Sequence, residues 1–343
     1  MAASARTNDY ADLTRRIKGA GLLDKQPGYY TFKIISTFAL LAVSVALLVL
    51  VDNFFLLMLV AIFWGFVQLQ SGMLLHDSAH REVFNSGALN DALGLVTGNF
   101  ILLMSASAWR VRHNSHHSRP NVPGADEDIT TPFLAYSKEQ ALQKRGIARL
   151  IVKFQAFIWF PLITLVPFSL RHALARRLFA GFKNRQQWKY HCVELLFLVA
   201  GIIFYFGIIF YFLSVGEAIA FIAVNTAALG LYFGTIFATN HKGMPFADGN
   251  EDFFLGQILT TRNVRGNPVI DFWMGCLDYQ IEHHLFPTMP RNNLSKAQVI
   301  VKAFCDEKGI EYYETRFFES YGEILRHFHE VSAPLRARTV NKV

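Results

Sequence analysis

The sequence contains few cysteines and little charge, and each shortage argues against a class of protein. Only three of the 343 residues are cysteine, Cys192, Cys276 and Cys305. They form neither a CxxC pair nor an even framework, so a disulfide scaffold is not expected. Charged residues make up 17% of the chain, whereas hydrophobic residues make up 52% and include 32 phenylalanines. A soluble globular chain of this length rarely needs so much apolar surface.

The net charge of +7 does not indicate a nucleic-acid-binding protein. The basic residues of this chain do not interleave with surface aromatic residues, as they would on a nucleic-acid-binding face. They lie beside long apolar runs instead, where lysine and arginine mark the cytosolic side of a membrane. The basic residues near the N-terminus are not followed at once by an apolar stretch, so a cleaved signal peptide is not expected.

Five apolar runs approach the length of about 20 residues that a helix needs to cross the hydrocarbon core. They are residues 32–51, 54–75, 151–170, 193–213 and 218–238. Only short turns join the first two runs and the last two runs, and neither turn contains lysine or arginine. Each pair is therefore predicted to form a transmembrane hairpin whose turn lies on the non-cytosolic side.

The middle run, 151–170, is not expected to cross the membrane. Lysine and arginine flank it on both sides, which places both flanks in the cytosol by the positive-inside rule. Pro161 and Pro167 interrupt it as well. We therefore expect an interfacial helix here, and a second one over 88–109, where Gly94 and Gly98 break the apolar pattern.

The predicted fold is an all-α integral membrane protein with four transmembrane helices in two hairpins, interfacial helices and a cytosolic helical cap. Residues 1–31 are expected to form a cytosolic N-terminal segment, and 32–290 the membrane domain. Residues 291–343 are expected to form a cytosolic C-terminal part with amphipathic helices near 293–308 and 317–331. Both termini and every long loop are then cytosolic.

Eight of the twelve histidines fall into four short clusters. They are His76 and His80 in HDSAH, His113, His116 and His117 in HNSHH, His241 in ATNHKG, and His283 and His284 in QIEHH. Residues three and four apart lie on one face of a helix, so HxxxH and HxxHH each direct their imidazoles to one side. QIEHH repeats the second pattern, with Gln280 in place of the first histidine.

The predicted topology brings the four clusters to one layer beneath the membrane, because each lies at or beyond the cytosolic end of a span. One structural zinc normally takes four ligands, so eight imidazoles fit two metal ions better than one. Imidazole suits iron, copper, nickel and zinc, and residue type alone leaves the metal open. Spacing alone leaves His241 undecided. The remaining histidines, His172, His191, His327 and His329, are interpreted as ordinary polar residues.

These motifs resemble those of the membrane fatty acid desaturase family, whose signature is three histidine boxes. HDSAH is similar to the first box, HNSHH to the second and QIEHHLFP to the third, and the resemblance extends over about residues 54–290. Gln280 at the head of the third box is similar to the front-end group of the family, which places a double bond between an existing one and the carboxyl end. That group often carries a fused cytochrome b5 domain with an HPGG motif, and this sequence contains no HPGG.

The resemblance implies that all eight clustered histidines, His241 included, bind two iron ions, with O2 as co-substrate. It implies a fatty acyl substrate, bound to CoA, a lipid or a carrier protein. Without HPGG, electrons are expected from a separate redox protein such as ferredoxin or cytochrome b5. Five further residues could bind a metal ion directly or hold the imidazole of a metal-bound histidine in place. Gln280 and Asn240 could complete a coordination sphere, and Asp77, Glu282 and Asp278 could accept hydrogen bonds from ligating imidazoles.

Two other functions remain open from the sequence. A membrane hydroxylase, acetylenase or ketolase would share the metal centre and differ in product. A zinc-binding membrane receptor, hydrolase or transporter would share only the ligands. The histidines lie at the ends of the spans rather than within them, which argues against a transport pathway. A bacterial plasma membrane is favoured over the endoplasmic reticulum as the location.

Overall fold

The computed structural model describes residues 2–337 of the chain, with side chains from residue 9 onward. The end of the predicted C-terminal part, 338–343, lies outside these residues. Helices account for 72% of the chain, which confirms the predicted all-α class. The described part also contains two strands of three residues, β1 (Asn263–Arg265) and β2 (Glu314–Arg316), which pair in parallel.

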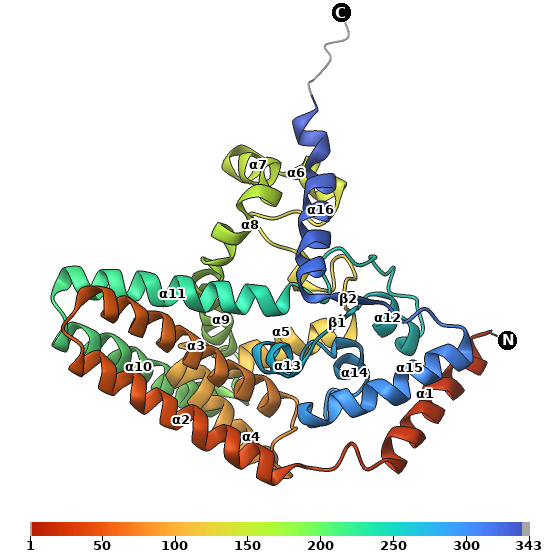
Figure 1. Cartoon of the computed structure of the whole chain (residues 1–343), viewed down its shortest axis with the longest axis horizontal. Coiled ribbons are helices and arrows are strands. Elements are labelled where there is room, and N and C mark those ends of the chain that lie inside the picture. Colours follow the sequence, from red (N-terminus) through yellow and green to blue (C-terminus); the bar gives the residue numbers. More distant parts are fainter. Residues whose placement is uncertain (1, 338–343) are drawn as a thin grey trace, which may run out of the picture.

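Four helices of the described chain are long and apolar enough to cross a membrane. They are α2 (Pro27–Leu50), α3 (Phe54–Ala79), α10 (Trp188–Phe212) and α11 (Val215–Phe237). These helices confirm the four predicted spans, with ends that differ by a few residues. They run side by side in Figure 1, and both hairpin turns lie at the same end of the bundle.

Both hairpin turns are fixed by side chains that cap the second helix of each pair. The Asn53 side-chain oxygen accepts hydrogen bonds from the backbone N–H groups of Phe55 and Leu56 at 3.0 and 3.1 Å. Ser214 and Glu217 form a capping box at the start of α11. These caps bind the first backbone N–H groups of α3 and α11, which have no partner inside the helix. Each second helix can therefore begin directly after a short turn.

The four helices differ in how much of their apolar surface the protein itself covers. Within their most apolar segments, 17% of α2 and 22% of α10 is buried, against 56% of α3 and 44% of α11. The exposed apolar faces of α2 and α10 fit contact with lipid, which solvates apolar side chains as well as a protein core does. The better packed pair, α3 and α11, leads directly to His76 and His241.

Both segments that were predicted to be interfacial are sharply bent. α4 (Gly87–Gly94) and the π-helix η1 (Leu95–Ile101) meet α5 (Ala106–Ser118) at 109°, and α7 (Gly146–Lys153) meets α8 (Gln155–Ile163) at 105°. Bends of this size occur in re-entrant loops and in broken spans, so the interfacial position of both segments stays a prediction. The helix α9 (Val166–Gly181) continues from α8.

The chain beyond α11 builds a cap at the end of the bundle opposite the hairpin turns (Figure 1). It contains α12 (Phe253–Leu259), α13 (Pro268–Met274), α14 (Gln280–Leu285) and α15 (Leu294–Lys308), and α1 (Ala2–Gly19) packs against α15. Two short 3-10 helices lie between longer ones: η3 (Arg291–Asn293) between α14 and α15, and η2 (Glu127–Ile129), earlier in the chain, after α5. The cap shares one apolar core, in which Leu13, Phe254, Ile281 and Phe304 are buried.

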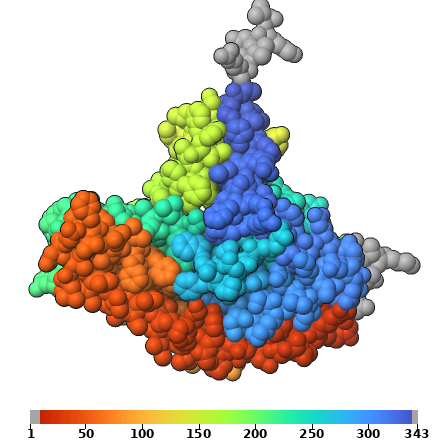
Figure 2. Space-filling view, viewed as in Figure 1, coloured from red at the N-terminus to blue at the C-terminus, as the bar shows by residue number. Residues whose placement is uncertain are grey.

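An arm projects from the body of the molecule (Figures 1 and 2). It consists of α6 (Lys138–Gln143), α7, α8 and the last helix, α16 (Phe317–Arg336). Trp159 and Ile163 on α8 pack with Ile324 and Phe328 on α16, which joins segments that are far apart in the sequence. The helices α15 and α16 coincide with the two amphipathic helices predicted near 293–308 and 317–331.

The contact between η1 and α10 yields a test of the fold. A Cβ atom at Gly201 of α10 would lie 2.3 Å from the carbonyl oxygen of Phe100, whereas one at Gly207 of the same helix would have no neighbour within 4 Å. We expect Gly201→Ala to destabilise the protein by about 1–3 kcal/mol, because backbone must move. Gly207→Ala should be neutral or slightly stabilising, because alanine favours a helix by about 1 kcal/mol over glycine. Thermal unfolding in detergent measures both, and equal melting temperatures would contradict the packing of η1 on α10.

Candidate metal centre

The four histidine clusters lie on separate elements that converge at the junction of bundle and cap. His76 lies in the last turn of α3, and His80 directly follows that helix. The second box lies within α5, and the third lies on the short helix α14. His241 follows the end of α11 by four residues. The helical spacing predicted for HNSHH and QIEHH is therefore present, and none of the eight imidazoles is more than 9% exposed.

The eight imidazoles form two groups of unequal size. The five-histidine group has ligand nitrogens within 4.8 Å of one another, and so does the three-histidine group. The first consists of His76, His80, His113, His117 and His283, and the second of His116, His241 and His284. The groups are adjacent, because the rings of His117 and His284 stack with centroids 4.1 Å apart.

Distances between the imidazole nitrogens fit the sharing of metal ions. The Nε2 atoms of His76 and His283, of His113 and His117, and of His117 and His283 are each 3.1 Å apart. In the three-histidine group the Nε2 atoms of His116 and His241 are 3.4 Å apart. Two nitrogens that bind one ion at about 2.0–2.1 Å lie roughly 3 Å from each other, so these spacings match a common ion in each group.

Four nitrogens of these imidazoles are buried without a hydrogen-bond partner, and two of the four are the outer Nδ1 atoms of His117 and His283. The other two support the same interpretation. They are Nε2 of His80 and Nε2 of His284, one in each group. A buried polar atom that lacks a partner is costly, and such atoms are uncommon in folded proteins. A metal ion in each group would satisfy both nitrogens, so the residues present fit a two-metal centre.

Four of the eight rings are oriented by acceptors on their outer nitrogen. The Nδ1 atoms of His76, His116 and His284 lie 3.2, 2.9 and 2.8 Å from Asp77 Oδ1, Asp126 Oδ2 and Gln257 Oε1 respectively. The Nδ1 of His241 lies 3.3 Å from the carbonyl oxygen of Thr260. An acceptor at Nδ1 directs the lone pair of Nε2 toward the centre, which is how ligating histidines are commonly held.

Burial sets the charge of the groups around the centre. It lowers the pKa of His283, His284 and His241 well below 6.5, and neighbouring imidazoles lower it further. These three rings are therefore neutral at pH 7, as metal binding requires. Burial opposes the ionisation of Asp126, but the hydrogen bond and positive charge of His116 outweigh it and hold the pKa of that carboxyl below its ordinary range.

The predicted polar residues beside the boxes fall in different places. The Gln280 amide nitrogen lies 3.3 Å from His241 Nε2, at the edge of the three-histidine group. Asn240 lies behind it and donates to Gln280 Oε1 at 2.8 Å. Asp77 contacts His76 as expected, and its other oxygen lies 3.0 Å from the buried guanidinium of Arg291.

Glu282 and Asp278 were expected beside imidazoles, and the structure does not bring them there. Glu282 accepts hydrogen bonds from Asn263 and Tyr312, both at 2.7 Å, and burial raises its pKa to about 7. Burial and the neighbouring Asp271 raise the pKa of Asp278 to about 8. For Glu282 the physical reason is helical rotation, because a residue that directly precedes a histidine on a helix faces about 100° away from it. Asp278 lies before the start of α14, so the helical period does not place it beside His283 or His284.

Three residues around the centre were not predicted to contact it. Asp126 belongs to a short acidic stretch, Asp126 to Asp128, that follows the second box. Gln257 is a single amide in the apolar helix α12, and Arg291 follows the third box in a loop. No local pattern indicates their roles, because each contacts a histidine box or its partner at least ten residues away in the sequence.

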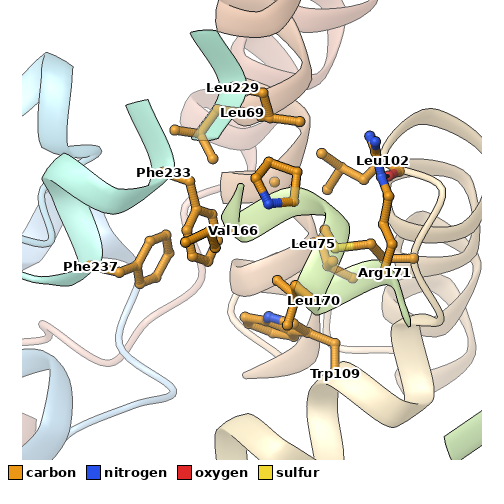
Figure 3. Close-up of a pocket in the computed structure, with 13 residues that line it drawn as sticks. Leu69, Leu75, Leu102, Trp109, Val166, Leu170, Arg171, Leu229, Phe233 and Phe237 are labelled. Atoms are coloured by element: carbon orange, nitrogen blue, oxygen red, sulfur yellow. Dashed lines mark hydrogen bonds between the residues drawn. The ribbon is translucent and has the colours of Figure 1, made fainter. Parts of the chain in front are cut away.

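Figure 3 shows an apolar cavity, and two of its lining residues, Leu75 and Trp109, adjoin the five-histidine group. The cavity has a volume of about 460 Å³ including its open side, and Leu75, Trp109, Leu170, Phe233 and Phe237 are among its lining residues. Leu75 precedes His76, and the Trp109 ring stacks on His113 with centroids 4.4 Å apart. Ligand-binding pockets are commonly lined by apolar and aromatic side chains of this kind.

Comparisons with known proteins agree with this site. A family model described as "Fatty acid desaturase" matches residues 37–316. The chain is 30% identical to an "Acyl-lipid (9-3)-desaturase" of Physcomitrium patens, across 89% of this chain and 59% of that protein. It is 30% identical to a "Delta(8)-fatty-acid desaturase" of Euglena gracilis, across 93% and 77%. A "Delta(6)-fatty-acid desaturase" of Caenorhabditis elegans is 29% identical, across 96% and 76%.

The lowered histidine pKa values predict how metal retention depends on pH. Protons displace a metal only where they can bind the imidazoles, and burial moves that point to a pH below 6.5 for His241, His283 and His284. Although burial opposes it, the hydrogen bond and charge of Asp126 raise the pKa of His116 above 6.5. We therefore expect the three-histidine group to lose its metal first as the pH falls from 8, and the five-histidine group to keep its metal until the pH is below 6.5. Metal analysis after dialysis at each pH measures this. Release of both metals above pH 6.5 would contradict the neutral, buried state of His283 in the five-histidine group.

Proposed function

The chain belongs to the fatty acid desaturase family, and from this premise we propose that it introduces a carbon–carbon double bond into a fatty acyl chain. The observation that carries the proposal is that eight imidazoles converge next to an apolar cavity, to which Trp109 connects them by stacking on His113. The family supplies the type of reaction. The names of the relatives give different double-bond positions, so they support desaturation without assigning a position to this protein.

The proposed cofactor is a pair of iron ions, held by the five-histidine group and the three-histidine group. Iron, when bound, supplies the redox chemistry with dioxygen that amino-acid side chains cannot perform. The overall reaction removes one hydrogen from each of two adjacent methylenes. Together with two electrons and two protons, those hydrogens reduce one O2 to two waters, so atoms and electrons balance.

The protein's own contribution is to hold and orient. Asp77, Asp126 and Gln257 keep the imidazoles in one orientation, so little rearrangement is needed when metal binds. Trp109 contributes to both parts of the site, because it stacks on His113 and lines the cavity. A methylene pair of an extended acyl chain would be positioned there against the five-histidine group, away from bulk water.

The polar end of the substrate is proposed to lie near Arg171. Its guanidinium is the charged group among the cavity-lining side chains, and its Nε donates to the carbonyl oxygen of Leu102 at 3.0 Å. Within residues 9–337, no carboxylate lies within ion-pair distance of Arg171. A cation without a counter-ion beside an apolar cavity suits an acyl group with a polar or anionic end, such as an acyl lipid or acyl-CoA.

The electrons are proposed to come from a separate redox protein, such as ferredoxin or cytochrome b5. We propose that the metal centre faces the cytosol, with 1–31 and 291–343 on the same side as the cap. The turns without lysine or arginine then lie on the opposite side of the membrane, as the positive-inside rule requires.

The arm is proposed to rest on the cytosolic membrane surface. The side chains of Phe154, just before α8, and of Phe157 and Phe160 within it are 41%, 68% and 41% exposed. Arg145 and Arg149 are exposed at the neighbouring helix α7. Exposed aromatic residues next to basic residues are typical of helices that lie in the interface of an anionic membrane.

Product analysis tests the proposed reaction. Cells that express the wild-type chain with a redox partner should accumulate an acyl chain that lacks two hydrogens, detected by mass spectrometry. His116→Ala should abolish this product, because it removes one ligand of the three-histidine group. His172→Ala is the matched control and should retain it, since His172 is exposed and lies outside both groups.

Other outcomes of this experiment decide against desaturation. A product that gains one oxygen would assign hydroxylation instead. Purified protein that contains zinc alone and yields no product with either donor would favour the zinc-binding alternative.

A narrower cavity should change the range of acyl chains that react. Gly72 lines the cavity, and a Cβ atom there would make ordinary contacts of 3.4 and 3.5 Å. Gly72→Leu is expected to reduce conversion of long acyl chains at least tenfold relative to shorter ones, without loss of metal, because it fills cavity space. Gly207→Leu, in open surroundings on α10, should leave the product profile unchanged. Equal loss for all chain lengths would argue that this cavity does not hold the acyl chain.

A further inference from the structure

We propose that Gln257 is a positioning residue. It holds the ring proton of His284 on Nδ1 and so leaves Nε2 free to complete the three-histidine group as a metal site. The inference rests on the proposed two-metal function and extends it to a residue outside all the histidine boxes. The inference also distinguishes the two histidine groups, because it predicts that the protein can lose the metal of the three-histidine group and keep the metal of the five-histidine group.

Packing holds Gln257 opposite His284. On α12, Phe254 and Gln257 are three residues apart and face the same side, as do Ile281 and His284 on α14. Phe254 and Ile281 are buried in the same apolar core. Gln257 is 1% exposed, so its amide lies in the interior and must find its hydrogen bonds there.

Hydrogen-bond chemistry determines the orientation of this amide. One end lies 2.9 Å from the backbone carbonyl oxygen of His117, and the other lies 2.8 Å from Nδ1 of His284. A carbonyl oxygen can only accept, so the Gln257 nitrogen must face His117. The amide oxygen then faces His284, and because it too can only accept, Nδ1 of His284 must carry a hydrogen.

The position of this hydrogen fixes the chemistry of the other ring nitrogen. A neutral imidazole has one N–H, so a hydrogen on Nδ1 leaves a lone pair on Nε2. In the described part of the chain, Nε2 of His284 is buried and has no hydrogen-bond partner. It belongs to the cluster of nitrogens formed with His116 and His241. Gln257 therefore prepares His284 to bind metal through Nε2.

The same short helix orients a second ring of this group. Thr260, which caps the end of α12, offers its carbonyl oxygen to Nδ1 of His241 at 3.3 Å. Gln257 also contacts the five-histidine group, but only through the backbone of His117. Without the Gln257 amide, the ring proton of His284 could move from Nδ1 to Nε2, whereas the ring nitrogens of the five-histidine group would keep their surroundings. The metal of the three-histidine group should therefore be weakened selectively.

Substitutions at Gln257 test this inference by metal content. Gln257→Met keeps the length of the side chain and removes both hydrogen bonds. Gln257→Glu retains an acceptor for His284. Gln155→Met is a matched control, because Gln155 is fully buried and bonded to the backbone of Ala135 and Phe328 in the arm, far from any histidine box. Each purified protein would be dialysed against graded concentrations of a chelator and its iron counted by elemental analysis.

We expect Gln257→Met to lower the affinity for one of the two irons by about 10–100-fold, which is the usual effect of removing the hydrogen-bond partner of a ligating histidine. At a chelator concentration where wild type keeps two irons, it should keep one, whereas Gln257→Glu and Gln155→Met should keep two. Two irons of wild-type affinity in Gln257→Met would overturn the inference and leave the proposed function standing. A wild-type protein that never binds two metals would instead count against the proposed function.

A second measurement keeps the inference testable if Gln257→Met does not fold. Nitrogen NMR of the metal-free wild-type protein, labelled at histidine, distinguishes a proton on Nδ1 from one on Nε2. We expect His284, assigned by its loss in His284→Gln, to carry the proton on Nδ1. A proton on Nε2 would overturn the proposal.

Discussion

The structure depends on one constraint: eight imidazoles must be buried side by side, and each must be neutral when it binds metal. Buried alone, each ring would leave at least one nitrogen without a partner, at a cost of about 1–3 kcal/mol. Convergence in two groups removes this cost at the inner nitrogens if each group binds one metal ion, and the nitrogen spacings of 3.1–3.4 Å fit a shared ion. Much of the remaining architecture serves to bring these rings to one place and to keep them in one orientation.

The membrane helices and the cap meet this constraint in different ways. α3 and α11 bring His76 and His241 to the junction, and their packing against each other fixes the distance between the two chain segments. The cap supplies α14 and covers the site from the other side. Hydrogen-bond acceptors then fix the rings: carboxylates serve His76 and His116, whereas an amide and a backbone carbonyl serve His284 and His241. The same arrangement leaves an apolar cavity open beside His113, where an acyl chain has room.

The sequence predicted those parts of the molecule that depend on local pattern. The two hairpins followed from runs of apolar residues separated by short turns, and the clusters HNSHH and QIEHH followed from the period of the α-helix. Asp77 could be predicted as a partner because it is adjacent to His76 and lies beside it in space. The same reasoning misplaced Glu282 and Asp278, since a neighbour in the sequence can face another direction. Gln257 and Arg291 could not be predicted, because their contacts depend on how separate helices pack. The strands β1 and β2 were missed because three residues are too few to form a pattern.

The account's central claim is that two metals lie in two unequal histidine groups, and anomalous X-ray diffraction at the iron absorption edge tests it most directly. We predict two anomalous peaks per chain, one among His76, His80, His113, His117 and His283 and one among His116, His241 and His284. A single peak, or peaks that appear only at the zinc edge, would contradict the account.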